Sequence, residues 1–336
     1  MQPHGSDRVT CARTREGFDL PVIDVTNPRF AVPDDPERVQ GLYDAFIAHE
    51  RRRRYLPAFV LRWMLRMAAG KSRLVHALVD PQAGFLDGLS TYVMKLGAEN
   101  LVPPYDTPVD RRVAGSPHIV LLRLRMQQVA QLVAQGIADD LAGADAAAPL
   151  ALINIGGGPA LDSINALILL RRDRPGLLER RIAIEVLDAS QDGAFFGANA
   201  LAALQAERGP LAGLEIAMRH HDYDWNQPAA LASLVDKRIA AGAVIAASSE
   251  GALFEYGSDQ AIVANLQALR AGAGARLVAG SVTSSDDTRR RMIATTRFKL
   301  YPRGVAGFAP LAAQAGFRIA KTQSVLLSDQ VLLRPI

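Results

Sequence analysis

The sequence predicts an α/β protein in which a doubly wound, largely parallel sheet follows a mainly helical amino-terminal part. Three observations support this fold class. An apolar run at 149–170 breaks at three consecutive glycines and then resumes at helix length. Further apolar strands follow, each separated from the next by a helix-length segment and each ending in small or polar residues. The chain finishes with two more apolar strands at 316–336. Such alternation is typical of a parallel sheet with helices on both faces.

The glycine turn is expected to join the first strand of this sheet to a helix. Gly156, Gly157 and Gly158 give the backbone access to positive φ and let a ligand approach the main chain. The helix that follows presents free N–H groups and a partial positive charge. A nucleotide or an amino-acid carboxylate would suit such a turn. The alternative is that the triplet is only a tight connection between a strand and a helix.

Four further strands are predicted, within 181–190, 214–225, 241–258 and 275–287. The second strand ends in Asp188, and a carboxylate at that position can accept both hydroxyls of a ribose. The segment 316–336 has a polar break near Ser328 and Asp329, which predicts a β-hairpin that closes the sheet. Ligands of such sheets bind outside the carboxyl ends of the strands.

These residues resemble the class I S-adenosylmethionine-dependent methyltransferase family over roughly 149–336. The resemblance implies a Rossmann-like sheet with a carboxyl-terminal antiparallel hairpin, and S-adenosyl-L-methionine as the cofactor. It also implies three sets of cofactor-binding residues. The set under the methionine part is Asn154, Gly156, Gly157, Gly158 and Asp162; Asp188 takes the ribose; Asp222 and Tyr223 flank the adenine. The loop departs from the commoner family form, an acidic residue followed by G-x-G-x-G, because Asn154 stands where that carboxylate often stands.

The end of the fourth strand is where the resemblance implies the reacting methyl group, facing Ser248, Ser249 and Glu250. In the same segment, Glu255 and Tyr256 could also contribute, because a carboxylate there could take a proton from an acceptor or hold an acceptor ammonium. The alternative is that Glu255 and Tyr256 only cap the next helix, at 258–269.

Tyr92 is a further catalytic candidate in the helical front. It shares a helix face with Lys95, whose ammonium could pair with a substrate or methionine carboxylate. The alternative is a surface lysine beside a packed tyrosine. His220 and His221 are adjacent, so on a strand they point apart, which argues against a metal site; one of them could serve as a base. Cys11 is the only cysteine, which excludes an intrachain disulfide and a cysteine-based zinc site. We therefore predict no metal.

The first 145 residues are predicted to form a mainly helical cap or substrate domain, and 146–336 the catalytic domain. Helices are expected over 36–54, 58–78, 84–96 and 118–141, with an extended piece at 20–32. A role of this front in building the acceptor pocket rests on analogy with the fold. Its apolar content permits a homodimer.

Composition excludes several classes of protein. The 336 residues carry a net charge of only +4, and 49% are hydrophobic, which is enough for a sizeable core. The basic run Arg51 to Arg54 lies in a helix-like segment and is expected to cover a solvated face. No apolar stretch is long enough for a membrane span, and we expect no export, because the start of the sequence shows no cationic segment followed by an apolar core. We expect a cytoplasmic enzyme with a small-molecule substrate and no nucleic-acid or membrane partner.

The leading functional hypothesis is methyl transfer to a small-molecule acceptor. A second hypothesis keeps S-adenosylmethionine and uses its aminocarboxypropyl arm, as in nicotianamine synthases and azetidine-2-carboxylate synthases, releasing methylthioadenosine. A third is an NAD-dependent oxidoreductase, favoured by the glycines and Asp188 but opposed by the missing G-x-G-x-x-G spacing. A fourth is a binding module that kept the fold and lost the chemistry.

Overall fold

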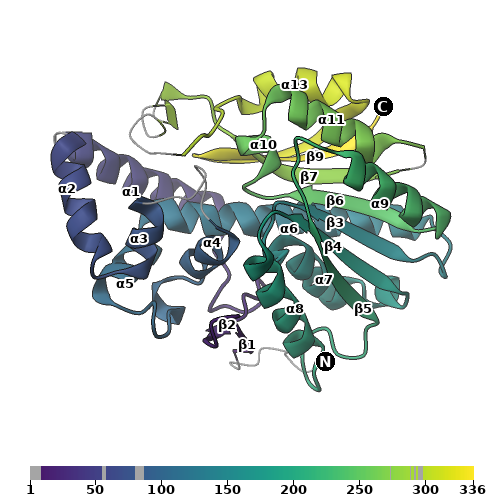
Figure 1. Cartoon of the computed structure of the whole chain (residues 1–336), viewed down its shortest axis with the longest axis horizontal. Coiled ribbons are helices and arrows are strands. Elements are labelled where there is room, and N and C mark those ends of the chain that lie inside the picture. The colour runs from purple at the N-terminus through teal and green to yellow at the C-terminus, as the bar shows by residue number, and fades with distance from the viewer. Residues whose placement is uncertain are drawn as a thin grey trace.

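The computed structural model describes residues 9–336 apart from 55–57, 80–86, 273, 288, 291–292 and 294–297. Seven of the described strands form one sheet in the order β5-β4-β3-β6-β7-β9-β8 (Figure 1). The strands are β3 (Leu150–Ile155), β4 (Ile182–Asp188), β5 (Ile216–Asp222), β6 (Val244–Ser249), β7 (Leu277–Thr283), β8 (Phe317–Val325) and β9 (Ser328–Pro335). The first five are parallel, and β9 runs antiparallel to both β7 and β8. The predicted parallel sheet with a closing hairpin is confirmed.

Helices cover both faces of the sheet (Figure 1). One face carries α6 (Pro117–Ala142), α7 (Leu161–Asp173) and α8 (Gln191–Gln205), and the other carries α9 (Ala229–Ala240), α11 (Asp259–Arg270) and α13 (Gly304–Gln314). The alternation along β3 explains this division, because Leu150 and Leu152 belong to the core on the α6 side while Ala151 and Ile153 belong to the core on the α9 side. All six residues of β3 are buried, as expected for a central parallel strand.

The amino-terminal part is mainly helical, as predicted. It contains a short hairpin of β1 (Cys11–Arg13) and β2 (Asp19–Pro21), then α1 (Pro36–Arg54), α2 (Ala58–Ala69), α3 (Arg73–Val79), α4 (Gly88–Lys95) and α5 (Pro108–Ala114) before α6. Figure 1 shows α1, α2, α3 and α5 beyond one end of the strands, whereas α6 runs beneath the sheet. The predicted boundary at residue 145 falls between α6 and β3, within a common core. The division into two domains stays a prediction.

Two local predictions in this part are wrong. The piece 20–32 is not extended throughout, because 25–30 forms turns in which Asp24 and Asn27 accept hydrogen bonds from nearby backbone N–H groups. The helix expected over 58–78 is two helices, because the chain turns at Gly70 and Ser72 then caps α3 by accepting from the N–H of Val75 at 3.0 Å. The start of the helix expected over 84–96 lies outside the described residues, and α4 covers the rest.

The hairpin turn lies at Leu326 and Leu327, two residues before the polar break that the sequence suggested. An apolar turn is stable here because Leu327 is buried among Val32, Phe46 and Leu124 of the amino-terminal part. The tip of the last hairpin is therefore part of the core under α1. No helix among the described residues has the length and apolar character that crossing a membrane would need.

Close backbone contacts fix the position of the glycine turn. A Cβ added to Gly88 of α4 or to Gly193 of α8 would lie 2.8 Å from the Cα of Gly158. A Cβ on Gly197, one turn after Gly193, would lie 2.5 Å from the carbonyl oxygen of Pro159. Because these neighbours are backbone atoms, they cannot move aside as a side chain can. The helices α4 and α8 therefore clamp the turn from two sides through glycine contacts.

Replacing a glycine inside a helix by alanine normally stabilises a protein. The close contacts of α4 and α8 with the glycine turn predict the opposite effect at Gly193. Gly193→Ala should destabilise the fold by roughly 1–3 kcal/mol, because its methyl group overlaps the Gly158 backbone. Gly41→Ala is the matched control, since Gly41 lies inside α1 and a Cβ there would meet nothing within 4 Å. The control should stabilise by about 0.5–1 kcal/mol. Urea unfolding of both variants measures the difference, and equal effects would contradict the clamp.

Candidate functional site

The candidate site lies where the strand order reverses, between β3 and β6. In doubly wound sheets the ligand crevice opens at this switch point, outside the carboxyl ends of the strands. Asn154 near the end of β3 stands in register with Ser248 near the end of β6, and both side chains are buried. The Nδ2 of Asn154 donates to the Ser248 hydroxyl at 3.2 Å. The two residues that the sequence placed at the ends of these strands are thus in contact.

Asp162, in the first turn of α7, completes this buried polar group. Its Oδ1 accepts from Asn154 Nδ2 at 2.6 Å and from the N–H of Ser163 at 2.9 Å. Its Oδ2 has no hydrogen-bond partner among the described residues. A carboxylate oxygen buried without a donor costs free energy unless a ligand supplies one. This oxygen is therefore a candidate acceptor for a cationic or N–H group of a ligand.

The pKa of Asp162 is raised to about 6. Burial is the main cause, and the negative charge of Glu250 adds to it. The Ser248 hydroxyl, the Ser163 N–H and the ammonium of Lys95 act in the opposite direction. The carboxyl group can consequently change its protonation state near neutral pH.

A chain of four buried charges runs behind Asp162. Lys95 of α4 contacts Glu250 Oε2, and the Nε of Arg125 in α6 donates to Glu250 Oε1 at 2.6 Å. Arg125 also donates to Glu255 Oε1 at 3.0 Å, and Glu255 belongs to α10 (Leu253–Tyr256). Burial alone would raise the pKa of Glu250, but Arg125 and Lys95 outweigh it and lower that pKa. The alternative that Lys95 is a surface lysine is wrong, because its side chain is only 6% exposed and its charge is neutralised within the protein.

The three glycines of the turn contact other parts of the protein. A Cβ on Gly157 would lie 2.0 Å from the Oδ1 of Asn154, and one on Gly156 would lie 2.7 Å from the Cβ of Ala252. Both Gly156 and Gly158 have positive φ, of 67° and 53°. The glycines are therefore required by packing and backbone conformation, whether or not a ligand is bound.

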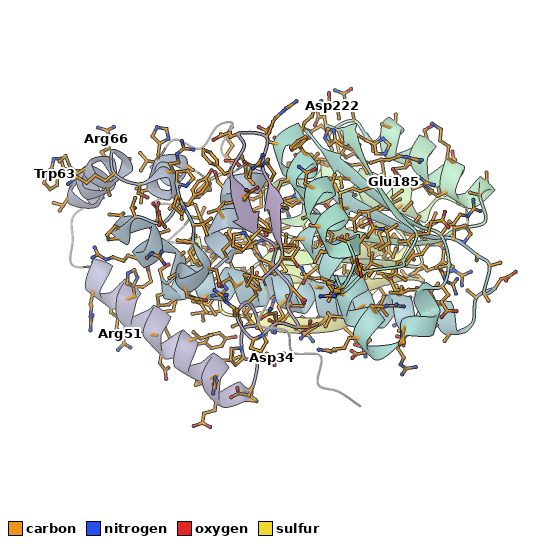
Figure 2. The ribbon with its side chains drawn as sticks, turned by 90° about the horizontal axis from the view of Figure 1, so that it is seen from below. Asp34, Arg51, Trp63, Arg66, Glu185 and Asp222 are labelled. Carbon is orange, nitrogen blue, oxygen red and sulfur yellow. The ribbon has the colours of Figure 1, made fainter. Side chains whose placement is uncertain are left out.

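Asp188 at the end of β4 is bonded to the glycine turn. Its Oδ2 accepts from the N–H of Gly158 at 2.9 Å and its Oδ1 accepts from the N–H of Ser190 at 2.8 Å. Asp222 stands in register with Asp188 at the end of β5 and is exposed. Figure 2 labels Asp222 at the rim and Glu185 further along the sheet, with Arg51, Trp63 and Arg66 at the opposite, helical end. The two carboxylates thus share one edge of the sheet.

Tyr223 lies below this edge rather than on it. It is 5% exposed, and its hydroxyl donates to the Oδ1 of Asn265 in α11 at 2.5 Å. Burial raises its pKa. The half-buried indole of Trp225 is the aromatic group that approaches the turn, because a Cβ on Gly156 would lie 3.1 Å from it. Sequence reasoning passed over Trp225, although it belongs to the same polar and aromatic segment, 220–225.

The other predicted catalytic residues are buried among protein groups. The Ser249 hydroxyl donates to the carbonyl of Ile155 at 2.9 Å and accepts from the N–H of Leu253 at 3.0 Å. The Tyr92 hydroxyl donates to the carbonyl of Pro21 at 2.5 Å and accepts from the N–H of Ile23 at 3.1 Å.

Burial raises the pKa of the Tyr256 phenol, and the negative charge of Glu255 raises it further. The helix α11 is capped by Ser258, which accepts from the N–H of Ala261, so the capping role considered for Glu255 and Tyr256 is not needed. Catalytic roles for Ser249, Tyr92 and Tyr256 stay predictions.

His220 and His221 point apart, as predicted. The Nε2 of His220 lies 2.8 Å from the carbonyl oxygen of Asp188, and the Nε2 of His221 lies 2.5 Å from Glu185 Oε2. Glu185 also contacts Arg238 of α9. Burial, with Arg219 and Lys237, lowers the pKa of His221. Within the described part of the chain, no three metal-ligating side chains gather at one point.

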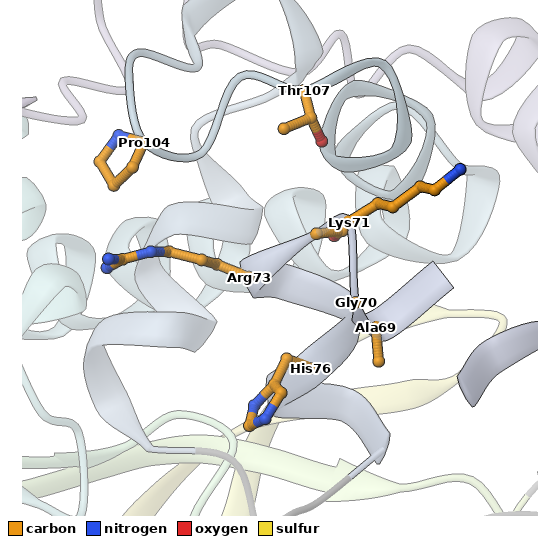
Figure 3. A pocket seen from close by; sticks show the side chains of 8 residues that line it. Ala69, Gly70, Lys71, Arg73, His76, Pro104 and Thr107 are labelled. Carbon is orange, nitrogen blue, oxygen red and sulfur yellow. The ribbon is translucent and has the colours of Figure 1, made fainter. Parts of the chain in front are cut away.

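A separate hollow of about 280 Å³ lies in the helical front (Figure 3). It is lined by Ala69, Gly70, Lys71, Ser72, Arg73, His76, Pro104 and Thr107. Figure 3 shows the side chains of Lys71, Arg73 and His76 pointing in different directions. The Nη1 of Arg73 donates to Glu16 at 3.0 Å. The basic groups therefore do not converge on a common ligand position, and the switch point remains the candidate site.

Comparisons with known proteins give structural similarities only. No family model matches the chain, and no curated protein matches it. The chain is similar to LepI in complex with SAM, with a TM-score of 0.45 and 12% identity over 90% of this chain and 95% of that one. It is also similar to an O-methyltransferase family protein from Burkholderia thailandensis, with a TM-score of 0.42 and 14% identity over 91% and 75% of the two chains. For CalO1, a methyltransferase in calicheamicin biosynthesis, the TM-score is 0.38 and the identity 14% over 83% and 72%.

The raised pKa of Asp162 predicts a pH-dependent penalty on stability. In the unfolded chain the carboxyl ionises near its ordinary pKa of 3.8, whereas in the fold it ionises near about 6. The folded state therefore holds the proton more tightly, and stability falls as pH rises from about 4 through about 6. The penalty should reach roughly 3 kcal/mol at neutral pH.

Asp162→Asn should remove this penalty, because an amide keeps the Oδ1 acceptor and carries no charge. We expect the ligand-free variant to melt at a higher temperature than the wild type at about pH 8, with the gap closing toward about pH 4. Thermal unfolding across pH measures this. A gap that is constant with pH would show that Asp162 does not titrate as described.

Proposed function

We propose that the protein is an S-adenosylmethionine-dependent transferase acting on a small molecule. The observation that carries the proposal is the donor-free Oδ2 of Asp162, buried at the switch point directly after the glycine turn. A buried carboxylate in this position is complementary to a cation that also donates hydrogen bonds. The α-ammonium of S-adenosylmethionine has both properties, and its sulfonium adds a second positive charge.

The remaining predicted contacts fit the rest of this molecule. Asp188 has lone pairs left after its two backbone bonds, so its carboxylate can accept ribose hydroxyls. Asp222 stands in register with it at the next strand end, on the side where the resemblance implies the adenine. Trp225 offers an aromatic surface beside Gly156. We propose that these groups, with Asn154, Ser248 and Gly156 to Gly158, form the binding site.

Methyl transfer is the outcome that the sequence resemblance implies. Bound S-adenosylmethionine supplies a sulfonium that activates its attached carbons toward displacement. The contribution of the protein is then mainly to hold donor and acceptor in line, which needs little acid or base help. Glu250 is a poor candidate for a general base, because its carboxylate is paired with Lys95 and Arg125 and its pKa is lowered. It serves better as a fixed charge in the wall of the site.

The binding site can be tested without knowing the acceptor. Asp188→Ala removes the group proposed to hold the ribose, and Asp236→Ala on the exposed side of α9 is the matched control. Because hydrogen bonds to a charged group contribute about 1.5–3 kcal/mol, we expect the affinity for S-adenosylmethionine to fall roughly 10- to 100-fold in the first variant only. Isothermal titration calorimetry measures this, with NAD as the competing ligand. Binding of NAD in place of S-adenosylmethionine would favour the oxidoreductase instead.

One observation favours a second outcome at the same site. Cyclisation of the aminocarboxypropyl arm requires the α-ammonium to lose a proton before its nitrogen attacks the γ-carbon and methylthioadenosine leaves. Asp162, with a pKa raised to about 6, is matched to accepting such a proton near neutral pH. Methyl transfer makes no use of a proton acceptor at that ammonium. The chemistry of Asp162 therefore supports an azetidine-2-carboxylate synthase-like reaction as the alternative.

The two outcomes give different products from S-adenosylmethionine alone. If the arm cyclises, incubation without any acceptor should release methylthioadenosine, and Asp162→Asn should slow that release by about 100-fold or more, as expected for loss of a general base. If the protein is a methyltransferase, no turnover should occur until an acceptor is added, and S-adenosylhomocysteine should then form. Liquid chromatography with mass detection separates the two nucleosides. The Asp236→Ala variant again serves as the control.

A further inference from the structure

A second group of charged side chains lies between β4 and β5, away from the switch point. Glu185 of β4 stands in register with Arg219 of β5, and Leu187 stands in register with His221. Residues in register on neighbouring strands share a face of the sheet, as do residues two apart on one strand. Leu187 belongs to the core on the α9 side. The side chains of Glu185, Arg219 and His221 therefore all lie on that side.

Three basic side chains from β5 and α9 meet the single carboxylate of Glu185. The Nε2 of His221 lies 2.5 Å from Glu185 Oε2, and Arg238 of α9 contacts Oε1. The Nη1 of Arg219 lies 4.0 Å from the same Oε1. Glu185 is fully buried, whereas the side chains of Arg219 and His221 are 65% and 36% exposed. The basic groups therefore lie between the carboxylate and solvent.

These basic groups carry more positive charge than Glu185 requires. Arg238 neutralises the carboxylate, and His221 contacts its other oxygen, so the charge of Arg219 is in excess. Burial lowers the pKa of His221, and the positive charges of Arg219 and Lys237 lower it further. The Nε of Arg238 is buried and has no hydrogen-bond partner among the described residues. Excess positive charge and an unused donor both favour a bound anion.

We propose that Arg219, His221 and Arg238 form an anion-binding site that takes a phosphate group. A phosphate has several acceptor oxygens and as many as two negative charges, which suits two guanidinium groups and an imidazole that approach from a strand and a helix. S-adenosylmethionine has no phosphate group, so the ligand of this site is a second molecule. It is either free phosphate or a phosphorylated metabolite, and both present the same chemistry to the basic groups.

The test is a titration with inorganic phosphate, followed by ¹⁵N NMR of the histidine side chains, with His221→Gln used to assign the His221 signal. Arg219→Gln removes the excess cation and leaves Glu185 paired with Arg238. Because Arg219 is mostly exposed, this change should not unfold the protein. The affinity for phosphate should fall about tenfold or more, as expected for the loss of a charged hydrogen bond. Arg112→Gln, at an exposed position in α5, is the matched control and should bind phosphate like the wild type.

The pH dependence of binding gives a second readout. Sulfate is the probe, because its charge is constant over the range in which histidine titrates. The charged groups around His221 are Glu185 from β4, Arg219 from β5, and Lys237 and Arg238 from α9. A bound anion should raise the pKa of His221 by about one unit, so sulfate should bind about tenfold more tightly below that pKa than above it. His221→Gln should abolish this dependence.

Two results would overturn the inference. One is a His221 signal that stays in place during the phosphate titration, as it would if phosphate bound only elsewhere, such as at the hollow beside Lys71. The other is equal phosphate affinity of Arg219→Gln and Arg112→Gln. Ribose 5-phosphate distinguishes the two sources, because tighter binding than that of inorganic phosphate identifies a phosphorylated metabolite and equal binding identifies phosphate itself. S-adenosylmethionine is absent from these titrations, so the proposed function succeeds or fails separately.

Discussion

The structure depends on how it compensates charge at the switch point of the sheet. Three carboxylates, Asp162, Glu250 and Glu255, lie within the fold where the strand order reverses, and each is buried. Such groups are tolerated only when cations and donors meet them. Lys95 and Arg125 come from two helices of the amino-terminal part. Without these helices, the carboxylates at the edge of the sheet would repel one another with no cation beside them. The amino-terminal helices thus supply the cations that neutralise the buried carboxylates at this edge of the sheet.

Close backbone packing performs the complementary task of fixing the turn. Gly88 and Gly193 let α4 and α8 approach Gly158 within distances that no side chain allows. The same α4 carries Lys95 at its other end, so the element that presses on the turn also delivers the cation. The short helix α4 therefore both fixes the position of the glycine turn and places the charge of Lys95 at the site. This coupling gives the carboxyl of Asp162 a defined environment before any ligand arrives.

The fold class, the strands and the glycine turn could be predicted because they depend on local pattern. Apolar strands that end in polar residues occur five times at regular spacing, and that pattern needs no knowledge of tertiary contacts. The burial of Lys95 could not be predicted in the same way, because its partner Glu250 is 155 residues away. Arg125 was missed, although it lies in the segment LLRLRM of a predicted helix. A charged residue surrounded by apolar residues in a helix indicates that its charge is paired inside the protein. The hairpin turn was misplaced because Leu327, in the turn, is buried by a distant segment around Phe46.

That turn has a consequence for how the chain is made. Leu327 and Val325, close to the end of the sequence, complete a small core with Phe46 and Leu124, and the hydroxyl of Tyr43 donates to the carbonyl of Ser324 at 3.2 Å. During synthesis on the ribosome, the helices near Phe46 emerge long before these partners are translated. Their apolar surface is covered only when this last hairpin of the sheet folds back on them, so the front half completes its small core after the strands of the sheet have been made.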